Sequence, residues 1–476
     1  MLEFKNFSLE YTNSLNLKEK LFENINVSFK KASINVITGQ SGSGKSTLLK
    51  TINGIIPEIT GAKLSGELVY NGKNLFEEDI TQRSGIISTV FQNPKNQFFA
   101  VNSLDEIAFA LENRNIPREE IFERINHYTE ILSTKRLLDR DLLKLSGGEK
   151  QLVAISSVAV MDNDIYIFDE PSASVDNNSI EKLARVLQIL KDMGKIIIIA
   201  EHRLYYLKNI LDKLLIIKNK SLISYDKDEI NQELINRHNL RSLDKIEKSE
   251  LKNDNFIQKN LHDKSYNKYD KLICKNFYCK YRDKDKEIFD FSISFNEGIY
   301  FIIGENGIGK TSFIRNMCGL NKKQKGELYY NNEKVKNPNS LISLVMQDVN
   351  YQIFTESLLS EISIVTDDNS LKEETLKKFG LWEKKDFHPQ SLSGGEKQRL
   401  MLALAYASPK EIVILDEPTS GLCHKNMINL IKILKKMKEQ NKIIIIITHD
   451  YEFIKMAGGN VVEFVDEKKR NWELGL

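Results

Sequence analysis

Short apolar runs that end in glycine or in acidic residues occur at corresponding places in the two halves of the chain. The first half contains "INVITG" at 34–39 and "IYIFDE" at 165–170, and the second contains "IYFIIG" at 299–304 and "IVILDE" at 412–417. Continuous apolar runs of this length are typical of parallel strands that are buried on both faces. The hydrophobic pattern therefore predicts a parallel sheet in each half.

Two longer apolar stretches have the character of amphipathic helices. They read "LVAISSVAV" at 152–160 and "RLMLALAYA" at 399–407, and the same heptad, "LSGGEKQ", precedes both of them at 145–151 and 392–398. A serine followed by two glycines is typical of a capped helix start whose backbone amides stay open to an anion. We therefore expect one anion-binding helix N-terminus in each half.

The repeated segments indicate that the chain is a duplication. Equivalent residues are separated by 310 − 45 = 265 positions for Lys45 and Lys310, but by 393 − 146 = 247 positions for Ser146 and Ser393. The part of each half that precedes the "LSGGEKQ" heptad is therefore shorter by 265 − 247 = 18 residues in the second copy.

A charge-dense segment, residues 226–270, separates the two copies. It carries ten acidic and nine basic residues, a charge of 9 − 10 = −1, which is typical of a solvated, near-neutral linker with some helix. We expect an N-terminal domain at 1–225, this linker, and a C-terminal domain at 271–476. The alternation of strand, loop and helix predicts an α/β fold with a mostly parallel core sheet in both domains.

Composition and charge describe an ordinary globular protein. Hydrophobic residues make up 41% of the chain, and 68 Lys and Arg stand against 66 Asp and Glu, so no electrostatic footprint for nucleic acid or an anionic membrane is present. The first residues lack the pattern of a signal peptide, and the longest apolar runs are too short to span a bilayer. We expect a cytosolic chain, held at a membrane only by a partner, with its four cysteines as reduced thiols.

Each half has an apolar strand that runs into a glycine-rich loop. The loops are "GQSGSGKST" at 39–47 and "GENGIGKTS" at 304–312, and both match G-x-x-x-x-G-K-[ST]. The glycines let backbone amides close on phosphate groups, and the helix that follows adds a favourable dipole. We expect Lys45 and Lys310 to reach the terminal phosphates of a nucleotide.

The same pattern predicts a place for Mg²⁺ in each half. Ser46 and Thr311 end the loop motif and offer a hydroxyl to the ion. Asp169 and Asp416 end a predicted buried strand, where a carboxylate can hold the metal through water. An acidic strand end alone is a weak signal, but its pairing with a phosphate loop in the same half makes it a strong one.

Acidic and histidine side chains follow the predicted strands where catalysis would need them. Glu170 and Glu417 come directly after the two aspartates, where a base can orient an attacking water. His202 and His449 end the next apolar strand of each half. A single histidine at a strand end is more often structural, but its recurrence at one offset favours a contact with the γ-phosphate.

Two further pairs of residues are candidates for the site. Gln92 and Gln347 follow apolar residues and are placed to reach a metal ion or water. Tyr11 and Tyr281 lie just ahead of the first core strands and are candidates for stacking on a base. The simpler interpretation of each tyrosine is a partly exposed strand aromatic.

The ordered set of glycine loop, glutamine, "LSGGEKQ", "DEP" and histidine resembles the nucleotide-binding domains of ABC ATPases. In that family two such domains face head to tail, and the signature heptad of one caps the ATP held by the other. The resemblance implies two P-loop NTPase domains in tandem. Each is expected to add an antiparallel β layer and a helical subdomain to its core sheet, and to hydrolyse ATP with Mg²⁺.

The resemblance also assigns two composite sites. One is expected to pair the loop of the first half with the heptad of the second half, and the other the reverse, by head-to-tail pairing within the chain. The implied ATP-binding residues are Gly39, Gln40, Ser41, Gly42, Ser43, Gly44, Lys45, Ser46, Thr47, Gly304, Glu305, Asn306, Gly307, Ile308, Gly309, Lys310, Thr311, Ser312, Tyr11, Tyr281, Ser146, Gly147, Gly148, Ser393, Gly394 and Gly395. The implied catalytic residues are Glu170, Glu417, His202, His449, Gln92 and Gln347, and the implied metal ligands are Ser46, Thr311, Asp169, Asp416, Gln92 and Gln347.

Within that family, the stretches "NGIIPEITGAKLSGEL", "VFQNPKNQFF" and "VMQDVNYQIF" look like the tandem ATPases of energy-coupling factor (ECF) importers. Gln97 and Gln352 belong to that likeness. ECF importers take up vitamins or metal ions through a transmembrane scaffold and a substrate-binding membrane subunit. The likeness therefore implies these two partners, a place at the cytoplasmic face of the cell membrane, and no nucleic-acid partner.

The likeness also suggests where the scaffold is gripped. The segments 93–145 and 348–392 are expected to be the helical subdomains that hold it. Phe98, Phe99 and Phe354 are expected either to line the gripping groove or to pack in the core.

Other machines of the same chemistry remain open as alternatives. A sugar-type ABC importer also uses tandem ATPase domains, although such proteins often carry a degenerate phosphate loop and both loops are intact here. A ribosome-associated ABC-type translation factor calls for a longer, basic linker. A chromosome or repair ATPase needs long coiled coils or zinc-ligand insertions, which this sequence does not contain.

Two departures from the family pattern distinguish the halves. The loop after the second "DEP" has Cys423 where the first half keeps Asp176, and the first heptad is followed by Leu152 where the second has Arg399. Neither change removes a phosphate ligand or a carboxylate. We expect both sites to bind and hydrolyse ATP, at unequal rates.

Overall fold

The computed structural model describes residues 1–12, 18–173, 175–252, 255–280, 287–321 and 325–467. The chain divides into two compact units, and the boundary between them falls after Lys245. Unit 1 is Met1–Lys245 with Gly421–Lys425, and unit 2 is Ile246–Ser420 with Asn426–Leu476. Each unit contains a six-stranded and a four-stranded sheet, so the predicted α/β architecture is confirmed.

The six-stranded sheet of unit 1 is parallel except at one edge, where β9 and β10 form a hairpin. Its strands in spatial order are β10 (Ser221–Asp226), β9 (Lys213–Lys218), β3 (Ser33–Gly39), β8 (Ile196–Ala200), β7 (Ile165–Asp169) and β6 (Ile87–Val90). The central place of β8, between β3 and β7, brings the loops that follow these three strands to one edge of the sheet.

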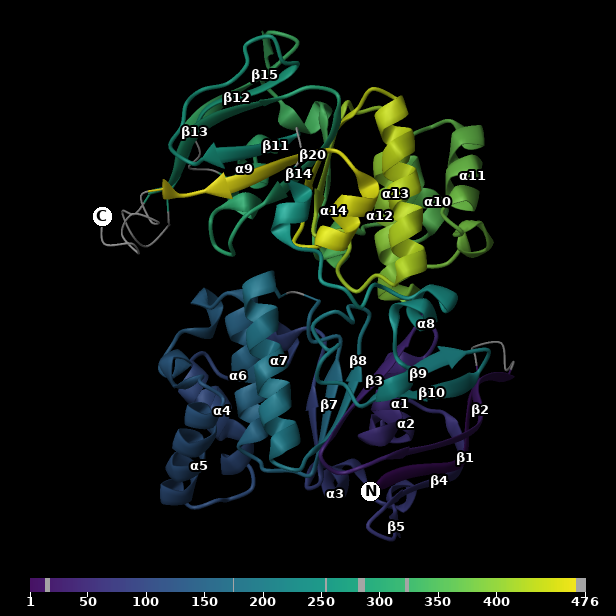
Figure 1. Cartoon of the computed structure of the whole chain (residues 1–476). Coiled ribbons are helices and arrows are strands. Elements are labelled where there is room, and N and C mark those ends of the chain that lie inside the picture. Colours follow the sequence, from purple (N-terminus) through teal and green to yellow (C-terminus); the bar gives the residue numbers. More distant parts are fainter. Residues whose placement is uncertain (13–17, 174, 253–254, 281–286, 322–324, 468–476) are drawn as a thin grey trace. The chain divides into compact units, whose positions relative to one another are not determined.

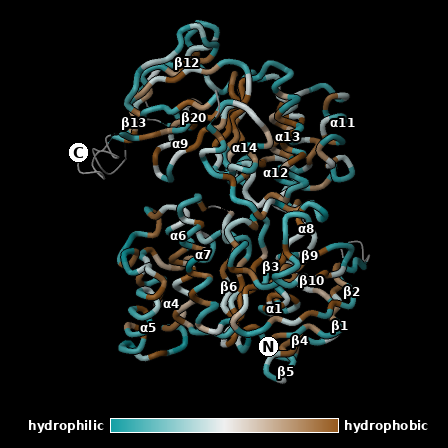
Figure 2. The backbone as a smooth tube through the Cα atoms, in the orientation of Figure 1, coloured by the Kyte–Doolittle hydropathy of each residue, from teal (hydrophilic) through white to brown (hydrophobic). Residues whose placement is uncertain are grey.

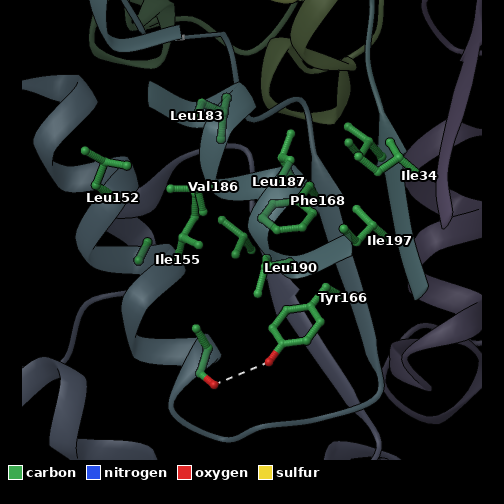
Figure 3. Packing of buried hydrophobic residues seen from close by; sticks show 14 of the residues in the cluster. Ile34, Leu152, Ile155, Tyr166, Phe168, Leu183, Val186, Leu187, Leu190 and Ile197 are labelled. Atoms are coloured by element: carbon green, nitrogen blue, oxygen red, sulfur yellow. Dashed lines mark hydrogen bonds between the residues drawn. The ribbon is translucent and has the colours of Figure 1, made fainter. Parts of the chain in front are cut away.

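The strands read as continuous apolar runs because both faces of the sheet are buried. Side chains alternate between the faces of a strand, and in β8 Ile197 and Ile199 belong to one core while Ile196 and Ile198 belong to the other. Figure 3 shows the first of these cores, where Phe168 packs among leucines of a long helix and the hydroxyl of Tyr166 donates to the carbonyl of Ala159 (3.3 Å).

Helices and a second sheet cover the two faces of the unit 1 core sheet (Figure 1). The antiparallel sheet, in spatial order, is β2 (Lys18–Phe29), β1 (Leu2–Thr12), β4 (Lys63–Tyr70) and β5 (Lys73–Asn74). The helices are α1 (Lys45–Ile52), α2 (Ile55–Glu58), α3 (Ile80–Ser84), α4 (Ser103–Glu112), α5 (Arg118–Ile131), α6 (Gly147–Ala159), α7 (Asn177–Asp192) and α8 (Gln232–Arg237). Helices α4 and α5 lie within 93–145, the range of the predicted helical subdomain.

Unit 2 repeats this plan with a different edge strand. Its core sheet is β11 (Phe256–Asn260), β20 (Asn460–Val465), β14 (Gly298–Ile303), β19 (Ile443–Ile447), β18 (Ile412–Asp416) and β17 (Ile342–Val345), all paired in parallel. Its antiparallel sheet is β13 (Glu287–Phe295), β12 (Leu272–Lys280), β15 (Lys325–Tyr330) and β16 (Glu333–Lys334). Figure 2 shows hydrophobic segments (brown) along the inner strands of each unit and hydrophilic segments (teal) along many of the outer loops.

The helices of unit 2 account for part of the shorter length of the second copy. They are α9 (Lys310–Met317), α10 (Leu358–Ser363), α11 (Asn369–Lys378), α12 (Gly394–Ala407), α13 (His424–Glu439) and α14 (Tyr451–Ala457). Helices α10 and α11 have 6 and 10 residues, where α4 and α5 of unit 1 have 10 and 14. Part of the length difference that the repeat offsets predict therefore lies in the helical subdomain.

Residues 226–270 do more than join the two copies. Leu234 and Ile235 of α8 are buried in the unit 1 core, and β11 pairs with β20 at the edge of the unit 2 sheet. The second sheet therefore takes its edge strand from the segment before it, whereas the first sheet takes its edge strand from its own hairpin.

Removal of a core side chain next to β7 tests the packing of unit 1. Leu187 is fully buried on α7, so Leu187→Ala should lower the free energy of unfolding by about 2–5 kcal/mol through lost burial and a cavity. Leu143→Ala is the matched control because Leu143 is 83% exposed, and a change within about 0.5 kcal/mol is expected. Urea denaturation followed by circular dichroism measures both, and equal effects of the two variants would contradict this packing.

Candidate functional site

The glycine loop, Glu170 and His202 of unit 1 lie at the carboxyl ends of β3, β7 and β8. The ladder of the sheet continues past the strand ends, since the amide of Glu170 donates to the carbonyl of Ala200 (2.8 Å) and the amide of Glu201 donates to Ile37 (3.0 Å). The same happens in unit 2, where the amide of Glu417 donates to Ile447 (2.9 Å). The backbone of these acidic residues is therefore held by the sheet itself.

The glycine loop of unit 1 has the backbone that its sequence requires. Gly42 and Gly44 adopt φ values of 80° and 101°, in the left-handed region that glycine populates readily. The side-chain oxygens of Ser41 and Ser43 are buried and have no hydrogen-bond partner among the described residues. Because buried polar atoms are nearly always satisfied in native proteins, the two orphaned hydroxyls indicate a polar ligand in this loop.

Lys45 begins α1 and lies against the predicted histidine. Its Nζ is 3.0 Å from Nε2 of His202 and 3.5 Å from the carbonyl of Gln40. Burial, reinforced by the positive charges of Lys45 and Arg241, holds the pKa of His202 well below its usual range. The imidazole is therefore neutral at pH 7 and can accept a hydrogen bond from the lysine ammonium.

The hydroxyl of Ser46 donates to Oδ1 of Asp169 at 3.0 Å. Burial raises the pKa of Asp169, although the hydrogen bond from Ser46 and the charge of Lys45 oppose this effect. A hydroxyl and a carboxylate oxygen side by side next to a phosphate loop are ligands of the kind that Mg²⁺ prefers. The side chains present thus fit the predicted metal site.

Glu170 lies between the predicted glutamine and the predicted histidine. Nε2 of Gln92 donates to Oε2 of Glu170 (2.8 Å), and Oε1 of Glu170 is 3.6 Å from Nε2 of His202. Burial raises the pKa of Glu170 to about 8; the charges of Glu201 and Asp169 add to this and that of Lys45 opposes it. The structure therefore brings Lys45, Gln92, Glu170 and His202 of unit 1 together.

Unit 2 has a related arrangement. Nζ of Lys310 donates to the carbonyls of Gly304 (2.8 Å) and Glu305 (2.9 Å), and Nε2 of His449 is 3.7 Å from Oε1 of Glu417. Burial raises the pKa of Asp416 to about 6, against the nearby positive charges of Arg315 and Lys310 and a hydrogen bond from Thr311.

Two residues predicted for the site of unit 2 stay predictions. Gln347 is exposed, as Gln92 is, but among the described residues it has no hydrogen bond to Glu417, whereas Gln92 donates to Glu170 in unit 1. Tyr281 lies outside the described residues. Its counterpart Tyr11 is half-buried on β1 and packs against the core between the two sheets of unit 1. Base stacking by these tyrosines therefore stays a prediction.

Both "LSGGEKQ" heptads form capped helix starts, at α6 and α12. The carboxylate of Glu149 accepts from the amide and the hydroxyl of Ser146 (both 3.0 Å), and Glu396 does the same for Ser393 (3.0 and 2.8 Å). The capping box fixes the serine and leaves the first amides of each helix for another acceptor.

The structure adds one buried acidic residue that the sequence analysis missed. Glu201 comes directly before His202, is 2% exposed and raises the pKa of Glu170 as described above. The signal was present in the repeat, because the equivalent residue of the second half is Thr448. The two strands match otherwise, so this position gives unit 1 an acidic side chain where unit 2 has a hydroxyl.

Comparison with known proteins gives consistent results. The family model for ABC transporters matches residues 22–173 and 288–420. A Treponema denticola protein described as an ABC transporter ATP-binding protein is 36% identical and covers 100% of this chain and 99% of its own length. A Clostridium perfringens protein of the same description is 31% identical over 94% of this chain and 86% of its own.

Among solved structures, the RNase-L inhibitor aligns with a TM-score of 0.59 at 20% identity, covering 92% of this chain and 85% of that one. A ribosome-bound archaeal ABCE1 aligns with a TM-score of 0.61 at 21% identity, covering 90% and 72%. At this identity the likeness shows the fold alone.

Replacement of the loop lysines tests whether the glycine loops hold nucleotide. Lys45→Ala or Lys310→Ala should weaken binding of AMP-PNP with Mg²⁺ by about ten- to a hundredfold at one of two sites, because each removes a charge-assisted hydrogen bond to phosphate. Lys50→Ala is the matched control, since Lys50 is an exposed lysine on the same helix as Lys45. Isothermal titration calorimetry measures the affinities, and unchanged binding in both loop variants would contradict the assignment.

Proposed function

The chain belongs to the ABC transporter family of ATP-binding proteins and is an ATPase, and on that premise we propose that it powers an ECF importer of a vitamin or metal ion. The observation that carries the proposal is that both units retain a phosphate-loop lysine, a strand-end aspartate and a following buried or half-buried glutamate. Two intact sets favour two working ATP sites. This weighs against the sugar-type importer, in which one of the two phosphate loops is often degenerate.

The geometry of unit 1 supports a division of labour among its side chains. We assign Lys45 to the terminal phosphates, Glu170 to orienting the attacking water, and His202 to the γ-phosphate. Gln92 already donates to one oxygen of Glu170, which leaves the other oxygen of that carboxylate for water. Burial raises the pKa of Glu170 to about 8, so its carboxylate is a stronger base than that of an ordinary exposed glutamate.

ABC ATPases use ATP with Mg²⁺. When bound, the ion neutralises charge on the phosphate oxygens. The hydroxyls of Ser46 and Thr311 and the carboxylates of Asp169 and Asp416 are the side chains that would hold it, and each hydroxyl lies within hydrogen-bond reach of its aspartate. We propose that Gln92 and Gln347 complete the ligand sets.

We further propose that the two units act as a head-to-tail pair. Ser393, Gly394 and Gly395 would cap the nucleotide in the unit 1 loop, and Ser146, Gly147 and Gly148 would cap the one in the unit 2 loop. Support comes from the open helix start of α12, where a Cβ added to Gly394 or Gly395 would meet no atom within 4 Å. Such a start can receive a phosphate oxygen at its free amides.

A group of exposed apolar residues in each helical subdomain is the candidate docking surface for the transmembrane scaffold. In unit 1 it contains Phe99 and Val101, which are 76% and 72% exposed, and in unit 2 it contains Tyr351 and Phe354, which are 73% and 78% exposed. Exposed apolar patches of this kind mark protein interaction sites. Phe98 packs against the unit 1 core and is partly buried there. It is therefore not counted as part of this surface.

The two glutamines of the ECF likeness shape the loops beside this surface. Oε1 of Gln97 accepts from the amide of Phe91 (3.2 Å), and Oε1 of Gln352 accepts from the amide of Met346 (2.7 Å). Each bond closes the loop that leads from the site glutamine to the exposed aromatic residues. These loops are therefore suited to pass a movement of the scaffold to Gln92 and Gln347.

The location follows from this proposal. No helix in the described part of the chain is long and apolar enough to cross a membrane. We propose that the protein is held at the cytoplasmic face of the cell membrane by the transmembrane scaffold and the substrate-binding subunit.

Replacement of each glutamate tests the two ATP sites separately. Glu170→Gln and Glu417→Gln should each lower the ATPase rate of the assembled membrane complex, and the double variant should lose about a hundredfold or more, because each amide cannot take a proton from water. Steady-state phosphate release measures the rates. A single variant that leaves the rate untouched would show that its site is silent.

Charged substitutions in the exposed aromatic residues test the docking surface. Phe99→Asp together with Phe354→Asp should lower copurification of the membrane subunits by roughly tenfold or more, because buried aromatic side chains carry much of the energy of an interface. Tyr269→Asp is the matched control, since Tyr269 is 81% exposed and lies outside both helical subdomains. Equal recovery of the membrane subunits with both proteins would contradict the assignment, and cosedimentation with ribosomes instead would favour the translation-factor alternative.

A further inference from the structure

The two units differ at the residue before the site histidine. In unit 1 this residue is Glu201, and in unit 2 it is Thr448, although the strands that lead to them, β8 and β19, are otherwise matched apolar runs. Both residues are buried. A carboxylate that is kept out of water next to a reaction site needs hydrogen-bond donors around it, so its partners indicate what it does.

The carboxylate of Glu201 accepts four hydrogen bonds. Oε1 accepts from the backbone amides of His202 (2.7 Å) and Arg203 (3.0 Å). Oε2 accepts from the backbone amide of Ser172 (3.4 Å) and from the hydroxyl of Tyr206 (2.9 Å). One side chain therefore joins the loop that carries His202 to the segment that directly follows Glu170.

The position of His202 matters because its ring lies between two groups of the site. Nε2 of His202 is 3.0 Å from Nζ of Lys45 and 3.6 Å from Oε1 of Glu170. The ring can keep these distances only if the backbone at residue 202 stays in place. Glu201 fixes that backbone through the amide of His202 itself.

Unit 2 anchors its histidine loop in another way. Oγ1 of Thr448 accepts from the amide of Asp450 (3.1 Å), and Asp450 caps α14 by accepting from the amide of Phe453 (3.2 Å). Unit 1 has Arg203 in place of Asp450, and an arginine side chain has no acceptor with which to cap a helix. Residues 205–210 accordingly form turns, where unit 2 has the helix.

We propose that Glu201 is a positioning residue of the N-terminal ATP site, which holds His202 against Lys45 and Glu170 and ties it to the segment after Glu170. This inference rests on the proposed roles of Glu170 and His202 in hydrolysis. It extends them, because the position of the histidine then depends on the carboxylate of Glu201 in unit 1 and on the capped start of α14 in unit 2. The two sites therefore hold their histidines by different contacts.

The test measures kcat and KM for ATP of the assembled membrane complex in two parent proteins. In the first parent, Glu417→Gln, only unit 1 keeps its catalytic glutamate. In the second parent, Glu170→Gln, only unit 2 keeps it. Glu201→Thr, which copies unit 2, and Glu201→Gln should lower kcat by about ten- to a hundredfold in the first parent, because small displacements of a site group cost rate at this scale. KM should stay within about twofold, and the second parent should keep its rate.

Three controls separate positioning from a general loss of structure. Glu181→Gln makes the same chemical change at an exposed glutamate of α7 and should change neither parent. Tyr206→Phe removes one of the four donors and keeps the carboxylate, so a smaller loss of kcat in the first parent is expected even if the Glu201 variants fail to fold. A raised KM, or an equal loss in both parents, would mean a merely structural residue and would overturn the inference.

The remaining outcomes are also distinct. An active Glu417→Gln parent whose kcat does not respond to Glu201→Thr would overturn the inference and leave the proposed function intact. An inactive Glu417→Gln parent would contradict the proposed function of the N-terminal site, and the inference would fall with it.

Discussion

The hydrogen-bond ladder of each parallel sheet does not stop at the strand ends, and the site depends on that continuation. Because β8 lies between β3 and β7, the amides of Glu170 and Glu201 both donate to neighbouring strands. The same holds in unit 2 for Glu417, whose amide donates to Ile447. A flexible loop would leave these acidic side chains free to turn into water. A fixed backbone instead keeps Glu170 buried beside the phosphate loop, where burial raises the pKa of its carboxyl to about 8.

The same sheet explains why two cores are needed in one unit. Alternate side chains of a buried strand point to opposite faces, so the isoleucines of β8 are divided between a core beneath α6 and α7 and a core beneath the antiparallel sheet. Leu152 is buried in the first of these cores. The equivalent Arg399 of unit 2 is only half-buried and donates to the carbonyl of Phe379 (3.2 Å). This departure directly after the heptads is thus a difference in packing.

Much of this arrangement could be predicted from residues whose local sequence decides their conformation. The apolar run before Gly39, the acidic end of β7 and the capped start at Ser146 all follow from short-range rules, and the structure has them in place. The pairing of β11 could not be predicted, because residues 256–260 are mostly polar and their partner β20 lies about two hundred residues along the chain. The hydrogen bond of Gln92 to Glu170 and the four partners of Glu201 likewise depend on contacts between distant segments, although the repeat itself pointed to Glu201.

Both units are expected to turn over ATP. Vanadate trapping with radiolabelled 8-azido-ATP, followed by photolysis and peptide mapping of the assembled membrane complex, tests this most directly. Label that depends on Mg²⁺ and vanadate should appear in peptides from unit 1 and in peptides from unit 2. Trapped label confined to one unit, or independent of vanadate in both, would contradict turnover of ATP by both units.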